Sequence, residues 1–446
     1  MHGAARATAK ALSMTQSRLR TLTLGCKVNQ YETEFVRQGL VDAGAFRDAN
    51  QDEAADLCVV NTCTVTNEGD SKSRQAIRKL ARQNPDARLI VMGCYATRAP
   101  EELAQLPGVV EVVTDKRELP DLLGRFGVVD IPNGISRFGN RHRAYIKVQD
   151  GCLLRCSYCI IPKVRPQMSS RPLDEIVDEA RRLANNGYRE IVLTGIHLGH
   201  YGVDQNWNKP KQDWLRLSTL LRRLMELPAD FRVRLSSIEA TEVTRELLEV
   251  MSDFSDRICP HLHVCLQSGS DRILRAMKRR WGTKRFIDRC ALAQEKLHKP
   301  ALTTDVIVGF PGETEEDFEQ TCELVRQVGF SKVHVFPFSP RRGTPAAEMA
   351  DQLPKGVKSA RGRELARIES ELREQYFSAL CGEKLQVMVE GRLPEHSDRV
   401  VGTSCRYAPV QLENQGSRLQ FGQLIELFAT SNRGGEFISG TLQKTV

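Results

Sequence analysis

The chain has 446 residues and a formal net charge of +8. This length predicts two or three domains, since one domain commonly holds about 100–200 residues. No apolar run approaches the roughly 18 residues that a membrane-spanning helix needs, so we expect no membrane partner. The modest positive charge fits general solubility or a basic face for an anionic partner, and charge alone does not separate the two.

The chain contains 13 cysteines, an odd number on a long chain without a secretory signal. This favours a cytoplasmic protein with reduced thiols, some of them metal ligands, over a disulfide-stabilised secreted fold. Residues 1–20 contain four basic residues and no acidic one. We interpret this segment as a disordered extension, or as sequence before a start at Met14, in preference to an organelle transit peptide.

Apolar, strand-like segments alternate with amphipathic helical segments in the first part of the chain. Strands are predicted at residues 20–26, 55–63 and 87–94, and helices at 29–44, 68–85 and from Pro100. Alternation at this spacing predicts an α/β domain, a parallel sheet with helices on both faces, which we assign to residues 18–128.

A linker with Gly and Pro, residues 128–140, precedes a second alternation of strands and helices. Its strands are predicted at residues 144–149, 190–195, 232–239, 261–269, 301–310 and 332–338. Helices are predicted between them at residues 172–187, 214–228 and 314–329, and a charged helix at 355–379 follows. Six βα units predict a full or partial βα barrel, which we assign to residues 138–376.

The tail changes character from Cys381 onward. Short strands separated by Gly, Pro and Asn are predicted at residues 384–391, 400–407, 423–429 and 439–443. Short strands of this kind predict a small all-β barrel, which we assign to residues 379–446.

Cys152, Cys156 and Cys159 lie on one short segment directly after the first strand of the predicted βα barrel. Three thiolates can hold three irons of a cubane cluster and leave the fourth iron open. A structural zinc site would close with four ligands. An open iron can bind S-adenosylmethionine (SAM), and electron transfer from the cluster can then release a 5′-deoxyadenosyl radical. Three unrelated core cysteines are the alternative, and this spacing is not typical of them.

Three more cysteines end the three predicted strands of the first domain. They are Cys26, Cys63 and Cys94. If these strands are parallel neighbours, the thiols emerge at one edge, in the crevice where open α/β sheets bind ligands. We therefore predict a second three-thiol cluster with an exchangeable iron, the alternative being chance cysteines at strand ends. Gly25, Thr62 and Gly93 are small and would let a bulky ligand approach the backbone.

Seven cysteines share no such placement, and we assign them no function. They are Cys58, Cys259, Cys265, Cys290, Cys322, Cys381 and Cys405. Cys58 and Cys265 fall inside predicted strands, where we expect them in the core.

The segments GCKVNQYETE, VVNTCTVTN and VMGCYA resemble the first domain of the methylthiotransferases, and YIKVQDGC with CSYCIIP resembles their radical SAM motif. The resemblance continues through HLHVCLQSGSDRILRAMKRR, TTDVIVGFPGETEEDF and FSPRRGTPAAEM. The tail resembles the TRAM module, a small RNA-binding β-barrel. Within the family, GCKVNQYETE and NTCTVTN are most similar to the branch that modifies N6-threonylcarbamoyladenosine beside the tRNA anticodon.

The resemblance implies two [4Fe–4S] clusters. Their ligands would be Cys26, Cys63 and Cys94 for the auxiliary cluster and Cys152, Cys156 and Cys159 for the SAM cluster. One SAM would methylate a sulfur at the auxiliary cluster, and a second would supply the radical that abstracts the hydrogen on carbon 2 of the adenine. The implied partners are tRNA carrying threonylcarbamoyladenosine and an electron donor such as flavodoxin or ferredoxin.

Three rival functions stay open. Two belong to the same family and act on isopentenyladenosine in tRNA or on an aspartate of a ribosomal protein. The third is a non-catalytic, RNA-binding iron–sulfur protein that senses redox state. Basic clusters at residues 71–82, 137–143 and 271–285 could contact RNA phosphates or form solvated helical faces.

By resemblance, Thr194 and Gly195 lie near the SAM amino group, although the same residues could form an ordinary βα turn. Glu239 could meet the ribose or carboxylate side of SAM, or it could cap the helix that follows. GFPGETEEDF lacks the lysine and spacing of a phosphate-binding loop, and we interpret Thr314 with Asp317 as a capping box.

Two positions depart from the family pattern without removing a cluster ligand. Pro166 follows Arg165 where the family often has Gly, and Cys265 replaces a common Pro before LQSGSD. Since Pro fixes φ and lacks a backbone donor, we expect local differences in shape at both places.

Overall fold

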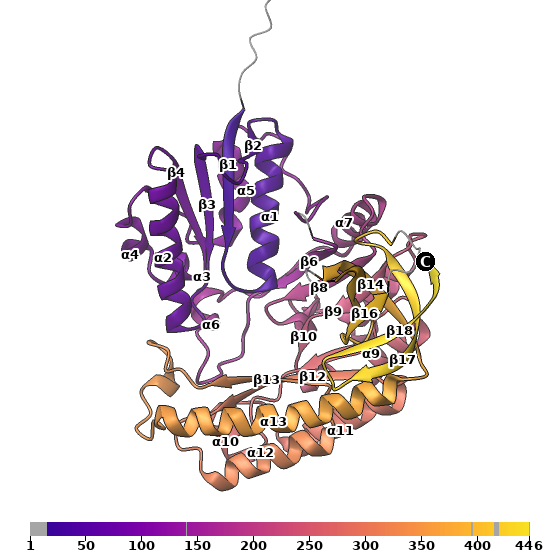
Figure 1. Ribbon diagram of the computed structural model, residues 1–446. Coiled ribbons are helices and arrows are strands. Elements are labelled where there is room, and N and C mark those ends of the chain that lie inside the picture. The colour runs from indigo at the N-terminus through magenta and orange to yellow at the C-terminus, as the bar shows by residue number, and fades with distance from the viewer. Residues whose placement is uncertain (1–15, 140, 394–395, 414–418, 446) are drawn as a thin grey trace, which may run out of the picture.

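The structure, a computed structural model, describes residues 16–139, 141–393, 396–413 and 419–445. The extension expected at the N-terminus therefore lies almost wholly outside the described residues. The chain folds as an N-terminal α/β unit, a central βα unit and a C-terminal barrel (Figure 1). None of the helices in these ranges is long and apolar enough to span a membrane.

The N-terminal unit is a five-stranded sheet in the order β2-β1-β3-β4-β5, with all neighbours parallel. Its strands are β1 (Ser17–Thr23), β2 (Phe46–Asp48), β3 (Leu57–Thr62), β4 (Arg88–Gly93) and β5 (Val109–Val112). Its helices are α1 (Lys27–Asp42), α2 (Asn67–Gln83), α3 (Cys94–Arg98), α4 (Pro100–Ala104) and α5 (Leu119–Arg125). The predicted parallel α/β sheet is confirmed; the short edge strands β2 and β5 were not predicted.

Two apolar layers enclose this sheet. One face packs against α1 and α5 through residues such as Val36 and Leu122. The other face packs against α2 and α4 through residues such as Ile77 and Leu103. β3 is buried along its whole length between these layers, and its first four residues are all apolar, as expected for a central parallel strand.

Part of the segment predicted as a linker, residues 134–138, packs against both neighbouring units. The backbone N–H groups of Ser136 and Arg137 donate to Oε1 of Gln38 on α1, at 2.7 and 3.2 Å. The N–H of Ile135 donates to Oε1 of Glu179 at 2.7 Å. This connection therefore fastens the N-terminal unit to the central unit instead of acting as a flexible tether.

The central unit is a partial βα barrel built from two four-stranded sheets, β7-β6-β8-β9 and β10-β11-β12-β13. A bridge between Val233 and Ile258 joins the two sheets. The strands are β6 (Arg143–Asp150), β7 (Ser169–Ser170), β8 (Glu190–Gly195), β9 (Arg232–Leu235), β10 (Ser237–Ile238), β11 (His261–Val264), β12 (Ala301–Val308) and β13 (Lys332–Pro337). The six βα units predicted from the sequence are present, and the barrel is partial.

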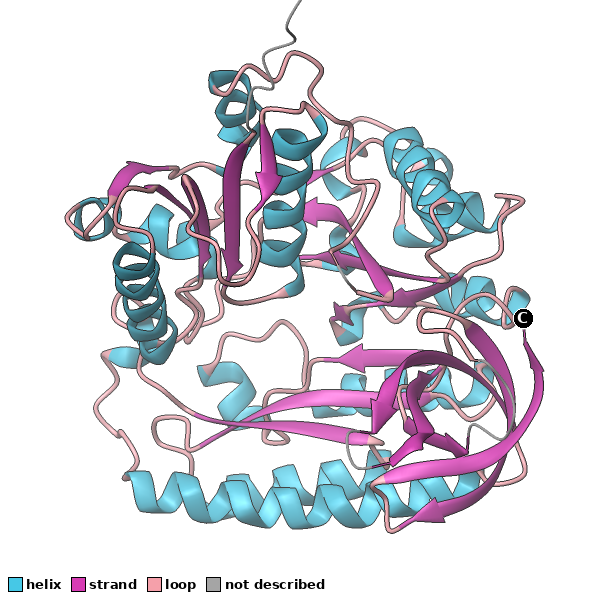
Figure 2. Cartoon of the chain, turned by 45° about the horizontal axis from the view of Figure 1, so that its top comes forward, coloured by secondary structure: helices cyan, strands magenta, loops and turns pink. Residues whose placement is uncertain are grey.

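Helices cover the outside of this barrel (Figure 2). They are α7 (Leu173–Asn185), α8 (Leu217–Met225), α9 (Arg245–Asp253), α10 (Asp271–Ala276), α11 (Thr283–Lys296), α12 (Glu315–Val328) and α13 (Lys355–Leu380). The short α6 (Ile161–Val164) instead packs against α3 of the N-terminal unit. The capping box at the start of α12 is confirmed: the N–H of Asp317 donates to Thr314, and the N–H of Thr314 donates to Asp317. The long α13 leads the chain to the C-terminal barrel (Figure 1).

The C-terminal unit is a closed barrel in the strand order β14-β15-β16-β18-β17. Its strands are β14 (Lys384–Leu393), β15 (His396–Ser404), β16 (Pro409–Glu413), β17 (Leu424–Arg433) and β18 (Phe437–Thr445). Leu385, Val387, Ile425 and Leu427 are among the buried residues of its apolar core. The small β-barrel predicted for the tail is therefore present.

A buried charge cluster docks this barrel onto the central unit. Glu190, whose side chain is fully buried, pairs with Arg232 at 2.6 Å and with Arg234 at 2.9 Å. The same two guanidinium groups donate to backbone carbonyls of Gln386, Thr403, Ser404 and Cys405. Glu190 thus holds two cations that bind the backbone of the C-terminal barrel.

We expect Glu190→Ala to weaken this docking, because it leaves Arg232 and Arg234 buried without their carboxylate. Breaking a buried ion pair from one side commonly costs about 3–5 kcal/mol. The measurement is the denaturant midpoint, together with the rate of proteolytic release of the C-terminal barrel. Asp178→Ala is the control, since its pair with Arg181 on α7 is about half exposed and such pairs contribute about 0–1 kcal/mol. Equal effects of the two substitutions would contradict the prediction.

Candidate active site

The structure brings Cys26, Cys63 and Cys94 to one edge of the N-terminal sheet. Cys26 is the N-cap of α1 just beyond β1, Cys63 directly follows β3, and Cys94 is the first residue of α3 after β4. Burial raises the pKa of Cys63, and the charges of Cys94 and Cys26 act in the same direction. The three thiols are therefore close enough to influence one another, as the strand order predicts.

The glycines beside these cysteines stand where neighbouring strand ends are in close contact. Gly93 has φ +98°, and a Cβ there would lie 2.2 Å from Oδ1 of Asn61 and 2.4 Å from the carbonyl oxygen of Thr62. Gly25 has φ +104°, and its Cβ would lie 3.0 Å from Cβ of Cys63. Both glycines therefore allow neighbouring strand ends to approach each other closely.

Cys152, Cys156 and Cys159 lie on the loop between β6 and α6. The N–H of Leu154 donates to Sγ of Cys152 at 3.4 Å, and the guanidinium of Arg279 donates to Sγ of Cys156 at 3.4 Å. Burial raises the pKa of Cys159 to about 12, and the neighbouring charges of Cys156 and Cys152 also raise it. A cation beside Cys159 would therefore be needed to favour its thiolate.

Both triplets fit a cluster better than a single ion. Among the described residues, the groups of three ligand atoms that lie within 4.8 Å of one another contain histidines and carboxylates, and neither cysteine triplet is one of them. Each triplet supplies three thiols, and three thiolates can hold three irons of a cubane and leave the fourth iron open. Protein donors already point at sulfurs of both triplets, as is usual around iron–sulfur clusters.

A buried arginine links the two triplets. Arg165, six residues after Cys159, has a side chain that is 1% exposed. Its Nε donates to Sγ of Cys94 at 3.3 Å, and its Nη2 donates to Oδ1 of Asn29 at 3.1 Å. Cys94 also packs against Ile160, next to the other triplet. The loop that carries one triplet thus contacts a cysteine of the other.

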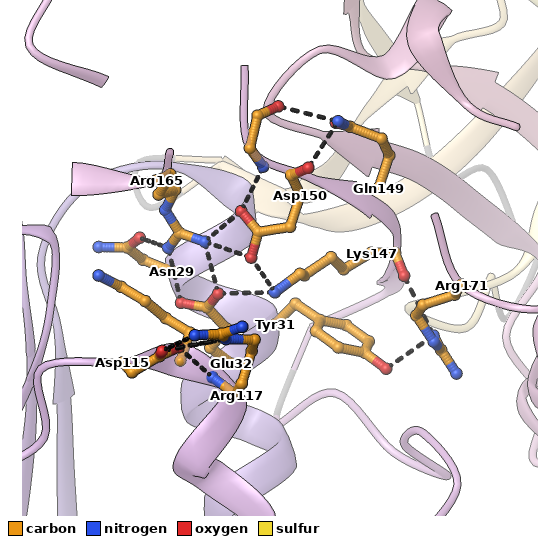
Figure 3. Close-up of polar contacts among 12 residues, drawn as sticks. Asn29, Tyr31, Glu32, Asp115, Arg117, Lys147, Gln149, Asp150, Arg165 and Arg171 are labelled. Atoms are coloured by element: carbon orange, nitrogen blue, oxygen red, sulfur yellow. Dashed lines mark hydrogen bonds and ion pairs between the residues drawn. The ribbon is translucent and has the colours of Figure 1, made fainter. Parts of the chain in front are cut away.

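Acidic groups from both units surround Arg165 (Figure 3). Glu32 of α1 accepts two hydrogen bonds from its guanidinium at 2.8 Å each, and Asp150 of β6 accepts another at 2.8 Å. Lys147 completes the group with contacts to Glu32 at 2.8 Å and Asp150 at 2.6 Å. Burial alone would raise the pKa of Glu32, but the charges of Arg165 and Lys147 lower it to about 2.

A second buried arginine makes a similar contact. Arg341, on the loop after β13, donates to Asp70 at 2.7 Å and to Oδ1 of Asn67 at 2.8 Å, both on α2. The FSPRRGTP segment therefore binds the N-terminal unit close to Cys63. These long-range ion pairs have no local sequence signal, and sequence analysis did not identify them.

A cavity of about 360 Å³ opens beside Cys156. His197, Glu239, Glu242 and Arg279 line it. The indole Nε1 of Trp281 donates to Glu239 at 3.1 Å, and Arg279 pairs with the same carboxylate. Glu239 therefore faces a space beside the radical SAM triplet, where a ligand of that cluster would lie.

The other two candidates for SAM contacts have different surroundings. Thr194 is buried at the end of β8, and a Cβ on Gly195 would lie 3.0 Å from Oε1 of Gln149. Neither lines the cavity beside Cys156. Glu239 does not cap α9, because Thr244 caps that helix by accepting from the N–H of Leu247. It is, however, the N-cap of the short 3-10 helix Ala240–Glu242, where its N–H donates to Glu242 at 2.7 Å in a capping box.

Two histidines near Cys152 were not identified from the sequence. Nδ1 of His197 lies 3.8 Å from Sγ of Cys152, and Nε2 lies 3.1 Å from Oε1 of Glu242. The ring of His200 stacks on that of His197 with 3.6 Å between centroids. The Glu242 carboxylate thereby fixes the orientation of an imidazole that contacts a predicted cluster ligand.

The two cysteines expected in the core, Cys58 and Cys265, have different surroundings. Cys58 lies in the core as predicted, but Cys265 is half-buried and belongs to none of the described apolar clusters. The N–H of Cys265 donates to the carbonyl of Ile238 at 3.2 Å, a bond that Pro could not form.

Arg279, in one of the basic clusters, is neither solvated nor free for RNA, because it is 3% exposed and paired with Glu239.

The sequence matches two known families. The Radical SAM superfamily matches residues 146–325, and the uncharacterized protein family UPF0004 matches residues 18–115. The first match contains the loop with Cys152, and the second contains Cys26, Cys63 and Cys94. Each predicted triplet therefore lies in its own recognised family.

Curated relatives match almost the whole chain. Threonylcarbamoyladenosine tRNA methylthiotransferase MtaB of Bacillus subtilis is 40% identical over 425 residues, 91% of this chain and 92% of that protein. The tRNA-2-methylthio-N(6)-dimethylallyladenosine synthase of Methylacidiphilum infernorum is 31% identical, with 94% of each chain covered.

Among solved structures, the radical SAM methyltransferase TsrM of Kitasatospora setae matches with a TM-score of 0.53 at 14% identity, over 74% of this chain and 75% of that one. At this identity the likeness concerns the fold alone. The relatives above, by contrast, share both domains at 31–40% identity over nearly their full length. The chain therefore belongs to the methylthiotransferase family of radical SAM enzymes.

Proposed function

We propose that this enzyme is a tRNA N6-threonylcarbamoyladenosine methylthiotransferase, which replaces the hydrogen on carbon 2 of the adenine beside the anticodon with a methylthio group. The observation that carries the proposal is the pair of three-cysteine sets on adjoining loops of two domains. The curated relatives with the same name support the choice of substrate. Its setting is the cytoplasm, where tRNA and a reduced flavodoxin or ferredoxin are available.

The proposal assigns a role to each unit. Residues 18–128 form the domain of the auxiliary cluster, with Cys26, Cys63 and Cys94 as ligands. Residues 138–376 form the radical SAM domain, with Cys152, Cys156 and Cys159 as ligands. Residues 379–446 form a TRAM barrel that binds the tRNA, and a groove lined by Arg399, Thr430, Ser431 and Arg433 offers polar donors for phosphates.

The two clusters and SAM, when bound, supply the sulfur, the methyl group and the radical that removes the hydrogen. The residues of the chain hold these groups in place. Arg279 and His197 contact sulfurs of the radical SAM triplet, while Arg165 contacts Cys94 of the auxiliary triplet. Glu239 lines the cavity beside Cys156 and is available to SAM, and we retain Thr194 and Gly195 as weaker candidates at the end of β8.

Iron content tests the two-cluster assignment. Anaerobic reconstitution of the full chain should give about eight irons, because each cubane holds about four. Replacing Cys26, Cys63 and Cys94 together by Ala should lower the content to about four, and so should replacing Cys152, Cys156 and Cys159. Replacing Cys58, Cys290 and Cys322 is the control and should leave about eight. A wild-type protein that saturates at four irons would rule out the auxiliary cluster.

Nucleoside analysis tests the substrate. Expressed in a bacterial strain deleted for its own threonylcarbamoyladenosine methylthiotransferase, the chain should restore the 2-methylthio form of that nucleoside in digested tRNA. Cys94→Ala and Cys152→Ala should each reduce the product to the level of the empty vector. Mass spectrometry of the same cells also reports methylthiolated isopentenyladenosine and methylthiolated ribosomal protein. Appearance of either product without the expected nucleoside would refute the proposed substrate.

Arg165→Gln tests the link between the domains. Hydrogen bonds to cluster sulfurs and positive charge nearby raise a cluster's reduction potential. Removing this guanidinium should therefore shift the auxiliary cluster to a more negative potential in a redox titration followed by electron paramagnetic resonance. Arg155 is an exposed arginine on the same loop as Cys156. Arg155→Gln should leave the reduction potential of the auxiliary cluster unchanged. Equal potentials in the Arg165 variant and the wild type would contradict the assigned role.

A further inference from the structure

Three polar side chains, none of them a predicted cluster ligand, meet on the inner face of the partial barrel. His263 on β11, Asp305 on β12 and His334 on β13 place ligand atoms within 4.8 Å of one another. Asp305 is paired in register with His334, and Nε2 of His263 lies 3.3 Å from Oδ2 of Asp305. Three neighbouring strands thus contribute one polar group each to a single cluster.

Strand alternation places this cluster in the barrel interior. Leu262, Leu302 and Val306 occupy the opposite faces of the same strands and pack in the main apolar core with residues of α12 and α13. Because side chains alternate along a strand, His263 and Asp305 face the lumen. Their side chains keep exposures of 15% and 29%, which is open to a ligand but shielded from bulk solvent.

The cluster has electrostatic neighbours on the sides of both cysteine triplets. Lys27 directly follows Cys26, and its ammonium interacts electrostatically with both Cys26 and Asp305. Cys265 follows His263 by two residues and lies on the same face. Its thiol interacts electrostatically with Glu239 and Asp305. Glu239 in turn lines the cavity beside Cys156. An adenine that must reach both clusters therefore passes within reach of these groups.

Much of the hydrogen-bonding capacity here is unused. Within the ranges that the structure describes, the side chains of Lys27 and His334 make no hydrogen bond or ion pair, and Oδ1 of Asp305 has no hydrogen-bond partner. The side chain of Lys27 is exposed, whereas those of His334 and Asp305 are half-buried. A ligand that covered these polar groups without satisfying them would bind at a cost. The lumen is therefore prepared for a polar ligand with both negative charge and hydrogen-bond donors.

We propose that Lys27, His263, Asp305 and His334 form the subsite that binds the threonylcarbamoyl substituent of the target adenosine. The inference rests on the proposed function and adds the residues that select the substrate. The carboxylate of the substituent binds the Lys27 ammonium, while its hydroxyl and ureido N–H groups donate to Asp305. His334 hydrogen-bonds the remaining polar atoms, and His263 holds Asp305 in place.

The rival hydrocarbon substituent fits this subsite poorly. An isopentenyl group offers no partner to Lys27 or Asp305, so binding it would bury both groups unsatisfied. Sites built to hydrogen-bond a substrate reject analogues that lack the bonding group by up to about 10⁴–10⁵-fold. The subsite therefore accounts for selection against isopentenyladenosine.

A divalent cation is the other ligand that two histidines and a carboxylate can bind. Two features disfavour it here. His263 already uses Nδ1 on Thr303 at 3.0 Å and Nε2 on Asp305, so it has no free ring nitrogen. The neighbouring Lys27 ammonium would also repel a cation.

Binding of short RNA provides the test. Anticodon stem-loops that differ only in bearing threonylcarbamoyladenosine or plain adenosine are titrated into the reconstituted enzyme with SAM, and fluorescence anisotropy gives both Kd values. The wild type should prefer the modified RNA. Lys27→Met and, separately, the isosteric Asp305→Asn should reduce this preference by about 10- to 100-fold. Lys27→Arg keeps the charge and should retain most of it.

The controls separate the possible failures. His298→Phe removes an exposed histidine outside the lumen and should keep the full preference. A wild type with equal affinity for both RNAs would overturn the proposed substrate together with the subsite. A wild-type preference that survives in Lys27→Met and Asp305→Asn would overturn the subsite alone. One equivalent of bound zinc that disappears in Asp305→Asn would show a metal site and also overturn it.

Discussion

The arrangement of this enzyme depends on one buried guanidinium. Chemistry shared by two clusters requires two domains to present their open faces to each other at a fixed separation. Arg165 supplies this constraint, because its five donors engage Glu32 and Asn29 of one domain, Asp150 of the other, and the sulfur of Cys94. In a low-dielectric interior such bidentate contacts are strong and directional, so the interface has one preferred geometry.

The position of Arg165 also explains a departure from the family pattern. Pro166 follows it, yet the loop still turns back: the N–H of Cys152 donates to the carbonyl of Arg165 at 3.3 Å. A Cβ on Gly151 would lie 1.9 Å from the carbonyl oxygen of Gln167, so the two sides of the loop are in close contact. The loop that carries the radical SAM cysteines is therefore closed on itself directly beside the domain interface.

Sequence analysis predicted the elements and the two cysteine sets because both depend on local patterns. Alternating apolar strands and amphipathic helices identify parallel sheets, and the cysteines stand at strand ends or on one short loop. The ion pairs could not be predicted in this way, since Glu32 and Arg165 are 133 positions apart. The close packing at Gly93 could not be predicted either, because its neighbours Asn61 and Thr62 belong to another strand.

The lumen residues had a sequence signal that was interpreted only in part. In HLHVC and KVHVF, polar residues alternate with apolar ones, a pattern that predicted strands but also marks which residues face inward. In a barrel that binds a ligand, the inward positions are the polar members of this alternation. His263 and His334 occupy such positions.

The docking of the C-terminal barrel has a geometric consequence. Arg234 binds carbonyls at the turn after β15, and the ring of Tyr407 on that turn stacks on His261 with 4.8 Å between centroids. These contacts fix the C-terminal barrel directly against the base of the βα barrel, so α13 is not its only attachment. A nucleic acid bound to the outer surface of this barrel would be held at a fixed distance from the active site. Only a nucleotide at one set distance along the strand could then enter that site.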